Sequence, residues 1–104
     1  MMNQEILNEI TQLKRKLLPN EKLILFGAQA RGDAKEDSEW NLLVLLNNRT
    51  TFIDDEINYA HPFKQIGLKK GIEINVWVYS INEWERRDFT PFYKKVQQEG
   101  IEIN

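Results

Sequence analysis

Glycine, arginine and small residues stand together in one stretch of the sequence, residues 27–32. It reads Gly-Ala-Gln-Ala-Arg-Gly and follows a short apolar run. Gly27 lets the backbone approach a phosphate closely, and the free amide groups and dipole of a helix that starts there favour an anion. Arg31 is suited either to a phosphate oxygen or to a structural ion pair. The stretch therefore predicts a contact with phosphate.

Acidic and amide side chains follow in two pairs that could hold a metal ion. Glu39 and Asn41 are two positions apart on an expected strand, which points both side chains to one face. Glu73 and Asn75 have the same spacing on a later strand. Proteins hold Mg²⁺ mainly through carboxylate charge. Glu39 and Glu73 are therefore the candidate metal ligands, and we expect them to bind metal weakly.

Hydrophobic spacing predicts the elements that position these residues. Apolar residues recur at helical intervals in residues 3–18, which predicts an amphipathic first helix. Proline at position 62 interrupts a later helix because it removes a hydrogen bond inside the turn. The expected strands are 22–26, 40–47 and 72–79, and the further helices are 27–32, 51–68 with a kink at 61–62, and 91–99. The apolar face of the helix from Thr51 is expected to comprise Phe52, Ile53, Ile57 and Ala60.

This order, α-β-α-β-α-β-α, predicts an α/β (α+β) fold. We expect one domain, residues 1–104, with a three-stranded mixed sheet flanked by helices. The first and last helices should cover the sheet face that holds Ile74 and Val76. The opposite face is then left to line a cleft with the polar residues Glu39, Asn41, Glu73 and Asn75.

Aromatic residues on these strands are best explained by packing. Trp40 lies between Glu39 and Asn41 and so faces the other way, into the core. Trp77 and Tyr79 lie on the side of the cleft, where sheet packing is the simpler interpretation. A floor for base stacking, or a surface for a partner, stays open as the alternative.

The pentapeptide Gly-Ile-Glu-Ile-Asn occurs at residues 71–75 and again at residues 100–104. Two copies of five residues do not make a repeat architecture. The second copy is consistent with a short tail strand.

Composition excludes several classes of protein. The chain has 104 residues, 41% of them hydrophobic and 29% charged, and a net charge of −2, so no basic footprint for nucleic acid is visible. The longest apolar runs are far shorter than the ~20 residues of a membrane span. With no cysteine and no expected signal peptide, the sequence predicts a cytoplasmic protein without disulfides.

Two coupled motifs resemble the signature of a known family. Residues 27–32 read Gly-x-x-Ala-Arg-Gly, and Ser38 opens a second segment that reads Ser-Glu-Trp-Asn-Leu-Leu-Val. Together, behind a strand, they resemble the minimal nucleotidyltransferases of the DNA polymerase β-like superfamily. The resemblance covers roughly residues 20–80 and implies transfer of a nucleoside monophosphate from a nucleoside triphosphate, with Mg²⁺ as cofactor.

The resemblance also assigns expected roles to individual residues. In the family a serine after the first glycine holds the triphosphate, and three aspartates bind two Mg²⁺ ions. The phosphate-binding positions correspond here to Gly27, Ala28, Arg31 and Ser38. The catalytic positions correspond to Glu39, Asn41 and either Glu73 or Asn75.

The sequence departs from the family pattern at these same positions. Ala28 replaces the serine and lacks its hydroxyl, Glu39 replaces an aspartate, and Asn41 is neutral. The third position falls on neutral Asn75, with Glu73 as a possible replacement. The motif is therefore degenerate, and we expect catalysis to be lost or severely reduced.

Three functions remain open. The first is an impaired member that binds a nucleotide or a protein, acting like an antitoxin with a HEPN-type partner, since minimal nucleotidyltransferases often work with one. The second is an active metal-dependent nucleotidyltransferase that modifies a hydroxyl of a protein or small molecule. The third is a structural or homodimerising domain. Nucleic acid and membranes are not expected partners.

Overall fold

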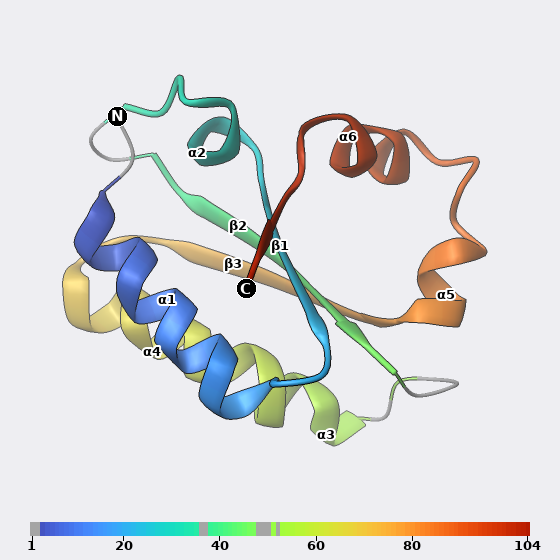
Figure 1. Cartoon of the computed structure of the whole chain (residues 1–104), viewed down its shortest axis with the longest axis horizontal. Coiled ribbons are helices and arrows are strands. Elements are labelled where there is room, and N and C mark those ends of the chain that lie inside the picture. The colour runs from blue at the N-terminus through green and yellow to red at the C-terminus, as the bar shows by residue number, and fades with distance from the viewer. Residues whose placement is uncertain (1–2, 36–37, 48–50, 52) are drawn as a thin grey trace.

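A mixed four-stranded sheet runs through the molecule in the order β3-β2-β1-β4 (Figure 1). The structure is a computed structural model and describes residues 3–35, 38–47, 51 and 53–104. The strands are β1 (Lys22–Phe26), β2 (Trp40–Leu46), β3 (Ile74–Ser80) and β4 (Ile101–Ile103). β1 pairs antiparallel with both β2 and β4, whereas β2 pairs parallel with β3. The predicted mixed α+β fold is confirmed.

The strand count is the first correction. Three strands were predicted for the sheet, and β4 is a fourth, formed by the second Gly-Ile-Glu-Ile-Asn copy. It pairs with β1 through Leu23 and Ile103, which places the C-terminal segment at one edge of the sheet. The expected tail strand is therefore present and belongs to the sheet.

The helices follow the predicted order, and the helix expected at residues 51–68 is divided into three segments. They are α1 (Gln4–Leu17), α2 (Ala28–Arg31), α3 (Ile53–Asp55), the π-helix η1 (Glu56–Ala60), α4 (His61–Lys70), α5 (Ile81–Glu85) and α6 (Pro91–Glu99). The predicted kink at His61-Pro62 corresponds to the change from η1 to α4, with Pro62 in the first turn of α4. α5 begins with a capping box in which Ser80 and Glu83 exchange hydrogen bonds.

The apolar face predicted for the helix from Thr51 is wrong in part. Ala60 is buried, but Ile53 and Ile57 are exposed, and Phe52 lies outside the described residues. A π-helix has wider turns than an α-helix, so residues spaced for an α-helical face do not stay on one face through η1. Before this helix, Thr51 donates its backbone N–H and its hydroxyl to Glu83 Oε2, each over 3.3 Å.

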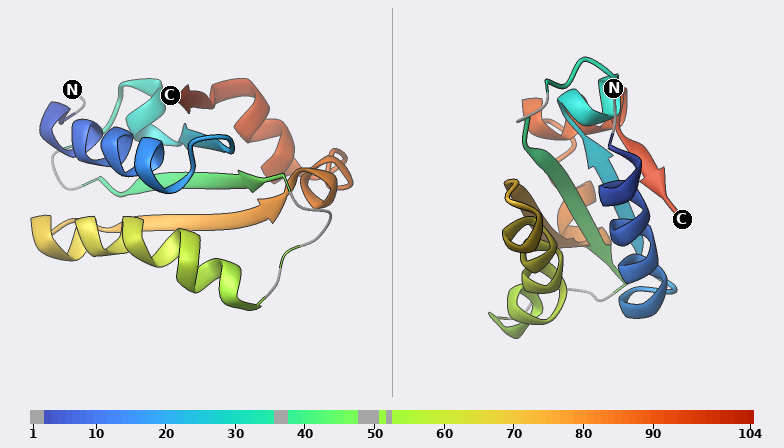
Figure 2. Two further views of the ribbon diagram at one scale, coloured as in Figure 1. Left: turned by 60° about the horizontal axis from the view of Figure 1, so that its bottom comes forward. Right: turned by 90° about the vertical axis from the view of Figure 1, so that its left-hand side faces the viewer.

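One face of the sheet is covered by α1 and α4, and the other by α5 and α6 (Figure 2). The first core contains Ile10 and Phe63 against Leu42 and Val76 of the strands. The prediction that the last helix covers this face is wrong, and α4 takes that place. α6 packs on the opposite face, where its Val96 lies in the second core together with Trp84 of α5.

The second core is aromatic. Phe26, Trp77 and Phe92 contact one another with ring centroids 5.3–5.6 Å apart. Tyr79 contacts Trp84 in the same cluster. The packing interpretation of Trp77 and Tyr79 accounts for these contacts. Trp40 is buried in the first core, as its alternation predicted.

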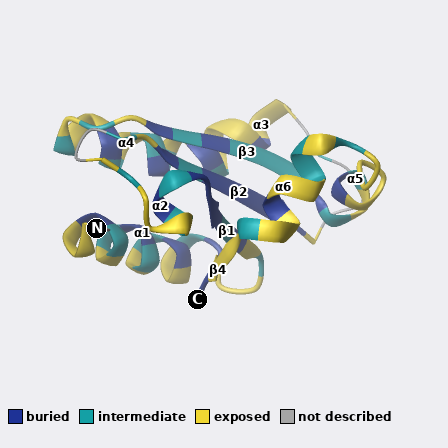
Figure 3. Ribbon diagram, turned by 90° about the horizontal axis from the view of Figure 1, so that it is seen from above, coloured by how far each residue is buried: buried dark blue, intermediate teal, exposed yellow. Residues whose placement is uncertain are grey.

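Burial is deepest along β2, while the outer surfaces of the helices are exposed (Figure 3). Within the described residues, no helix has both the length and the apolar composition to cross a bilayer. The polar residues Asn41 and Asn75 lie near the N-terminal ends of β2 and β3.

Candidate nucleotide-binding site

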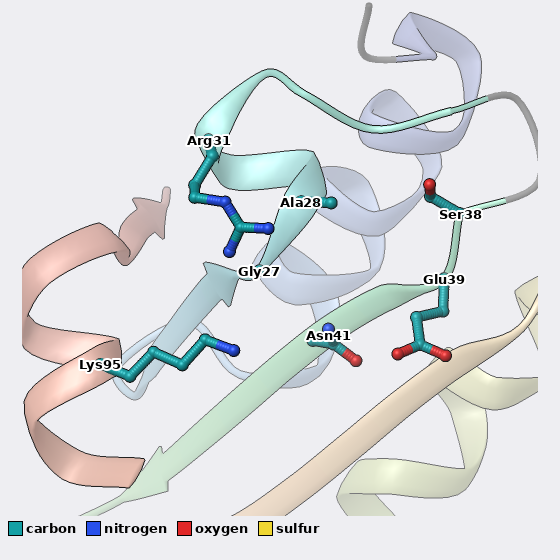
Figure 4. Close-up of a pocket in the computed structure, with 7 residues that line it drawn as sticks. All are labelled: Gly27, Ala28, Arg31, Ser38, Glu39, Asn41 and Lys95. Carbon is teal, nitrogen blue, oxygen red and sulfur yellow. The ribbon is translucent and has the colours of Figure 1, made fainter. Parts of the chain in front are cut away.

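A pocket of about 370 Å³ lies where β1 ends, α2 begins and β2 starts (Figure 4). Six of the predicted phosphate-binding and catalytic residues line it together with one other, Lys95: the lining is Gly27, Ala28, Arg31, Ser38, Glu39, Asn41 and Lys95. The structure therefore brings both sequence motifs to one place. Their roles in binding stay predictions.

Gly27 is the sharp bend between β1 and α2. Its φ of 87° lies in the region that favours glycine, and its ψ is −159°. A side chain there would also collide with Asn41, because an added Cβ would lie 2.7 Å from Asn41 Nδ2. The absence of a side chain at Gly27 thus lets the Asn41 side chain lie close to the Gly27 backbone.

The loop between α2 and β2 is held against α2 by local hydrogen bonds. Gln29 is buried and donates its Nε2 to the carbonyl oxygen of Ser38 over 3.1 Å. Ser38 Oγ accepts from the backbone N–H of Lys35 over 2.7 Å. These bonds place Ser38 and Glu39 at the mouth of the pocket. Gln29 was not singled out by its sequence position.

Arg31 forms structural ion pairs, which are one of the two roles that the sequence analysis gave it. Its Nε lies 3.1 Å from Asp33 Oδ2, and its Nη1 lies 2.6 Å from Glu99 Oε2. The hydrogen bonds that Arg31 donates to these carboxylates, to Asp33 first and to Glu99 second, raise the pKa of Arg31 above its ordinary value. The guanidinium has further N–H groups beyond these two contacts, and Arg31 lines the pocket.

Lys95 is the pocket residue that the sequence did not reveal. It comes from α6, far along the chain, and its ammonium lies 3.9 Å from Glu99. Figure 4 shows Lys95 and Arg31 on one side of the pocket and the Glu39 carboxylate on the other. No motif marks Lys95, because its place depends on how α6 packs on the sheet.

The other two predicted catalytic residues form a hydrogen-bonded chain with Asn41. The parallel register puts Asn75 directly opposite Asn41. Asn75 Nδ2 donates to Asn41 Oδ1 over 3.1 Å and to Glu73 Oε2 over 3.2 Å. By register, Asn75 is therefore the neighbour of Asn41 on β3. Glu73 lies next to it and does not line the pocket.

This donor set does not fit Mg²⁺. The ion requires several oxygen ligands in near-octahedral arrangement. Asn41 Oδ1 is engaged by Asn75, and Asn75 presents an amide N–H group rather than an oxygen. Among residues 3–35, 38–47, 51 and 53–104, no three acidic, histidine or cysteine side chains are grouped to hold a metal.

Comparison with known proteins places this architecture. The family described as "Nucleotidyltransferase domain" matches residues 5–101. A chain from a crystal structure of a toxin–antitoxin with AMP-PNP has a TM-score of 0.65 and 19% identity, over 94% of this chain and 72% of that chain. A chain from a mutant of the toxin–antitoxin MntA-HpeT has a TM-score of 0.63 and 18% identity, over 100% of this chain and 73% of that one. At this identity the likeness shows the fold. No curated protein gives a significant match.

Proposed function

The chain belongs to the nucleotidyltransferase domain family, and from this premise we propose that it binds a nucleoside triphosphate and a protein partner without transferring a nucleotide. The observation that carries the proposal is the 3.1 Å hydrogen bond from Asn75 to Asn41. Metal-dependent transfer needs carboxylates that hold two cations around the reacting oxygens. At these positions the chain has two amides that are hydrogen-bonded to each other, so the carboxylate ligands for the cations are missing.

Nucleotide binding is supported by the part of the site that remains. The pocket keeps Gly27 at the bend, and it places Arg31 and Lys95 on one wall. Its volume of about 370 Å³ lies within the range of small-molecule sites, roughly 300–1,000 Å³. Two cationic groups beside a glycine bend suit the phosphates of a nucleotide.

A protein partner is supported by the fold neighbours, both of which come from toxin–antitoxin structures. We propose an antitoxin-like role in which this chain neutralises a HEPN-type partner by surface contact. Neutralisation by contact would not require the catalytic carboxylates.

Titration with ATP and with GTP in buffer that contains Mg²⁺ tests nucleotide binding. A ligand that binds only the folded state stabilises it by about 2.7 kcal/mol at a hundredfold excess over Kd. We expect a rise in melting temperature for the wild type and for Lys94→Ala, and a smaller rise for Lys95→Ala. Both lysines are exposed on α6, and Lys95 lines the pocket. No rise at millimolar nucleotide rejects the proposal.

Co-expression with a candidate HEPN-type protein tests the proposed partner. We expect a stable complex and relief of toxicity, and the intact mass of the partner should be unchanged. Added mass of a nucleoside monophosphate would instead establish the active transferase.

A further inference from the structure

The side chains of Glu73, Asn75 and Asn41 form a chain of hydrogen bonds that ends at the pocket, and each bond fixes the orientation of the next group. A carboxylate can only accept hydrogen bonds, so Glu73 Oε2 fixes the N–H₂ group of Asn75 toward itself. The second hydrogen of that group goes to Asn41 Oδ1. The oxygen of the Asn41 amide is thereby turned to β3, and its N–H₂ group must face the other way.

That other direction is the pocket. Asn41 Nδ2 lies under Gly27, at 2.7 Å from the position a Cβ would take. Asn41 lines the pocket. Within the described part of the chain, its Nδ2 donates no hydrogen bond, and its Oδ1 accepts the one from Asn75. The position where the family resemblance implies a metal-binding carboxylate thus presents a hydrogen-bond donor.

The donors around the pocket have the character of an anion site. Arg31 and Lys95 contribute positive charge, and Asn41 contributes the amide donor. Glu39 is the one carboxylate among the lining residues. A bound divalent cation would meet the Glu39 carboxylate but also two cationic side chains and an amide N–H₂ group. A polyphosphate would meet three donors, although Arg31 and Lys95 are also paired with Glu99.

We propose that this pocket binds the polyphosphate of a nucleotide directly, without a divalent cation, through Asn41 Nδ2, Arg31 and Lys95. Glu73 is a positioning residue that sets the direction of the Asn41 amide through Asn75. The inference rests on the proposed function and specifies how that site recognises its ligand.

A substitution of Glu39 tests the proposal, because direct and metal-bridged binding predict opposite changes in ATP affinity. In direct binding, its carboxylate repels phosphate, so Glu39→Gln tightens ATP binding, by roughly two- to fivefold for a partly screened charge. In metal-bridged binding, Glu39 is a ligand, and the same change weakens affinity. Glu21→Gln is the matched control, because Glu21 precedes β1 at the end away from Gly27.

Asn41→Asp gives the second test. It replaces a donor by a carboxylate, and we expect ATP affinity in EDTA to fall about tenfold or more, since hydrogen bonds to charged groups are strong. Glu73→Ala should weaken affinity and Glu73→Gln should restore it, because glutamine keeps an acceptor for Asn75. A purely structural role of Glu73 would not give that rescue in affinity at unchanged melting temperature.

The decisive measurement is calorimetric titration of ATP in EDTA and in Mg²⁺, with adenosine as the ligand that lacks phosphate. We expect ATP to bind in EDTA at least as tightly as in Mg²⁺, and adenosine not to bind. Binding confined to Mg²⁺, or adenosine binding as tightly as ATP, overturns this inference and leaves the proposed function standing. Failure to bind in both buffers overturns the proposed function as well.

Discussion

Asn75 on β3 donates its side-chain amide to Asn41 on β2 over 3.1 Å, at directly opposed positions of a parallel pair. This amide pair replaces the carboxylates that the family resemblance implies. Because neither amide carries charge, the two side chains can lie opposite each other without a counter-ion between them. Replacing either amide by a carboxylate should reintroduce the need for one.

Asn75→Asp tests this need. The new carboxylate would lie beside Glu73 Oε2 and Asn41 Oδ1, and like charges at such a distance disfavour the charged form. We expect a loss of stability at pH 7 of about 1 kcal/mol, relieved by Mg²⁺. The wild type, melted with and without Mg²⁺, is the control. Equal responses of the two proteins to Mg²⁺ would contradict the prediction.

Gly27→Ala tests the bend at the mouth of the pocket. It combines a backbone conformation that other residues rarely adopt with a Cβ 2.7 Å from Asn41 Nδ2. We expect a loss of roughly 1–3 kcal/mol in urea unfolding, together with weaker ATP binding.

Gly32→Ala is the matched control for that change. Gly32 also has a positive φ, 82°, but a Cβ there meets nothing within 4 Å. It should lose stability through backbone strain and keep nucleotide affinity. Equal losses of affinity in the two variants would show that the close approach to Asn41 is unimportant.

Phe63→Ala tests the core between α4 and the sheet. Phe63 is completely buried, and truncation of such a side chain leaves a cavity. Typical losses for this substitution are about 3–5 kcal/mol, enough to unfold a marginally stable domain. Phe89→Ala is the control, since Phe89 is 74% exposed and should unfold at nearly the wild-type urea concentration. A small loss for Phe63→Ala would mean that α4 is not anchored here.

The contact of α1 with α4 should make stability depend on pH. The hydrogen bond and charge of Lys70 lower the pKa of Glu5 below its ordinary value. A lowered folded-state pKa stabilises fully above the unfolded value, about 4.3, and the contribution is lost as pH falls through the folded value. The same contact raises the pKa of Lys70, so its contribution disappears only at strongly alkaline pH.

Thermal melting of wild type and Glu5→Gln from pH 7 to pH 3 measures this contribution. The wild type should have the higher melting temperature at pH 7, and the two should converge in acid. A difference that is constant across this range would assign the effect to something other than the ion pair.

The sequence predicted which residues lie together at the pocket, while their roles in binding stay predictions. Gly27, Arg31, Glu39 and Asn41 lie within one short stretch, where spacing along a strand and bend fixes their relative positions. Lys95 could not be predicted, because it reaches the pocket only through the packing of α6 on the aromatic core. The exposure of Ile57 was missed because the prediction assumed α-helical turns through a segment that forms a π-helix.

The sheet order has a consequence for how strand direction is encoded. The two outer strands are β3 and β4. One copy of the same pentapeptide leads into β3, and the other contains the whole of β4. Yet β3 is parallel to its neighbour and β4 is antiparallel to its own. The same five-residue sequence is therefore compatible with both strand orientations. The direction is set by the connection that precedes each strand: a long crossover through α3, η1 and α4 leads to β3, and a reversal after α6 leads to β4.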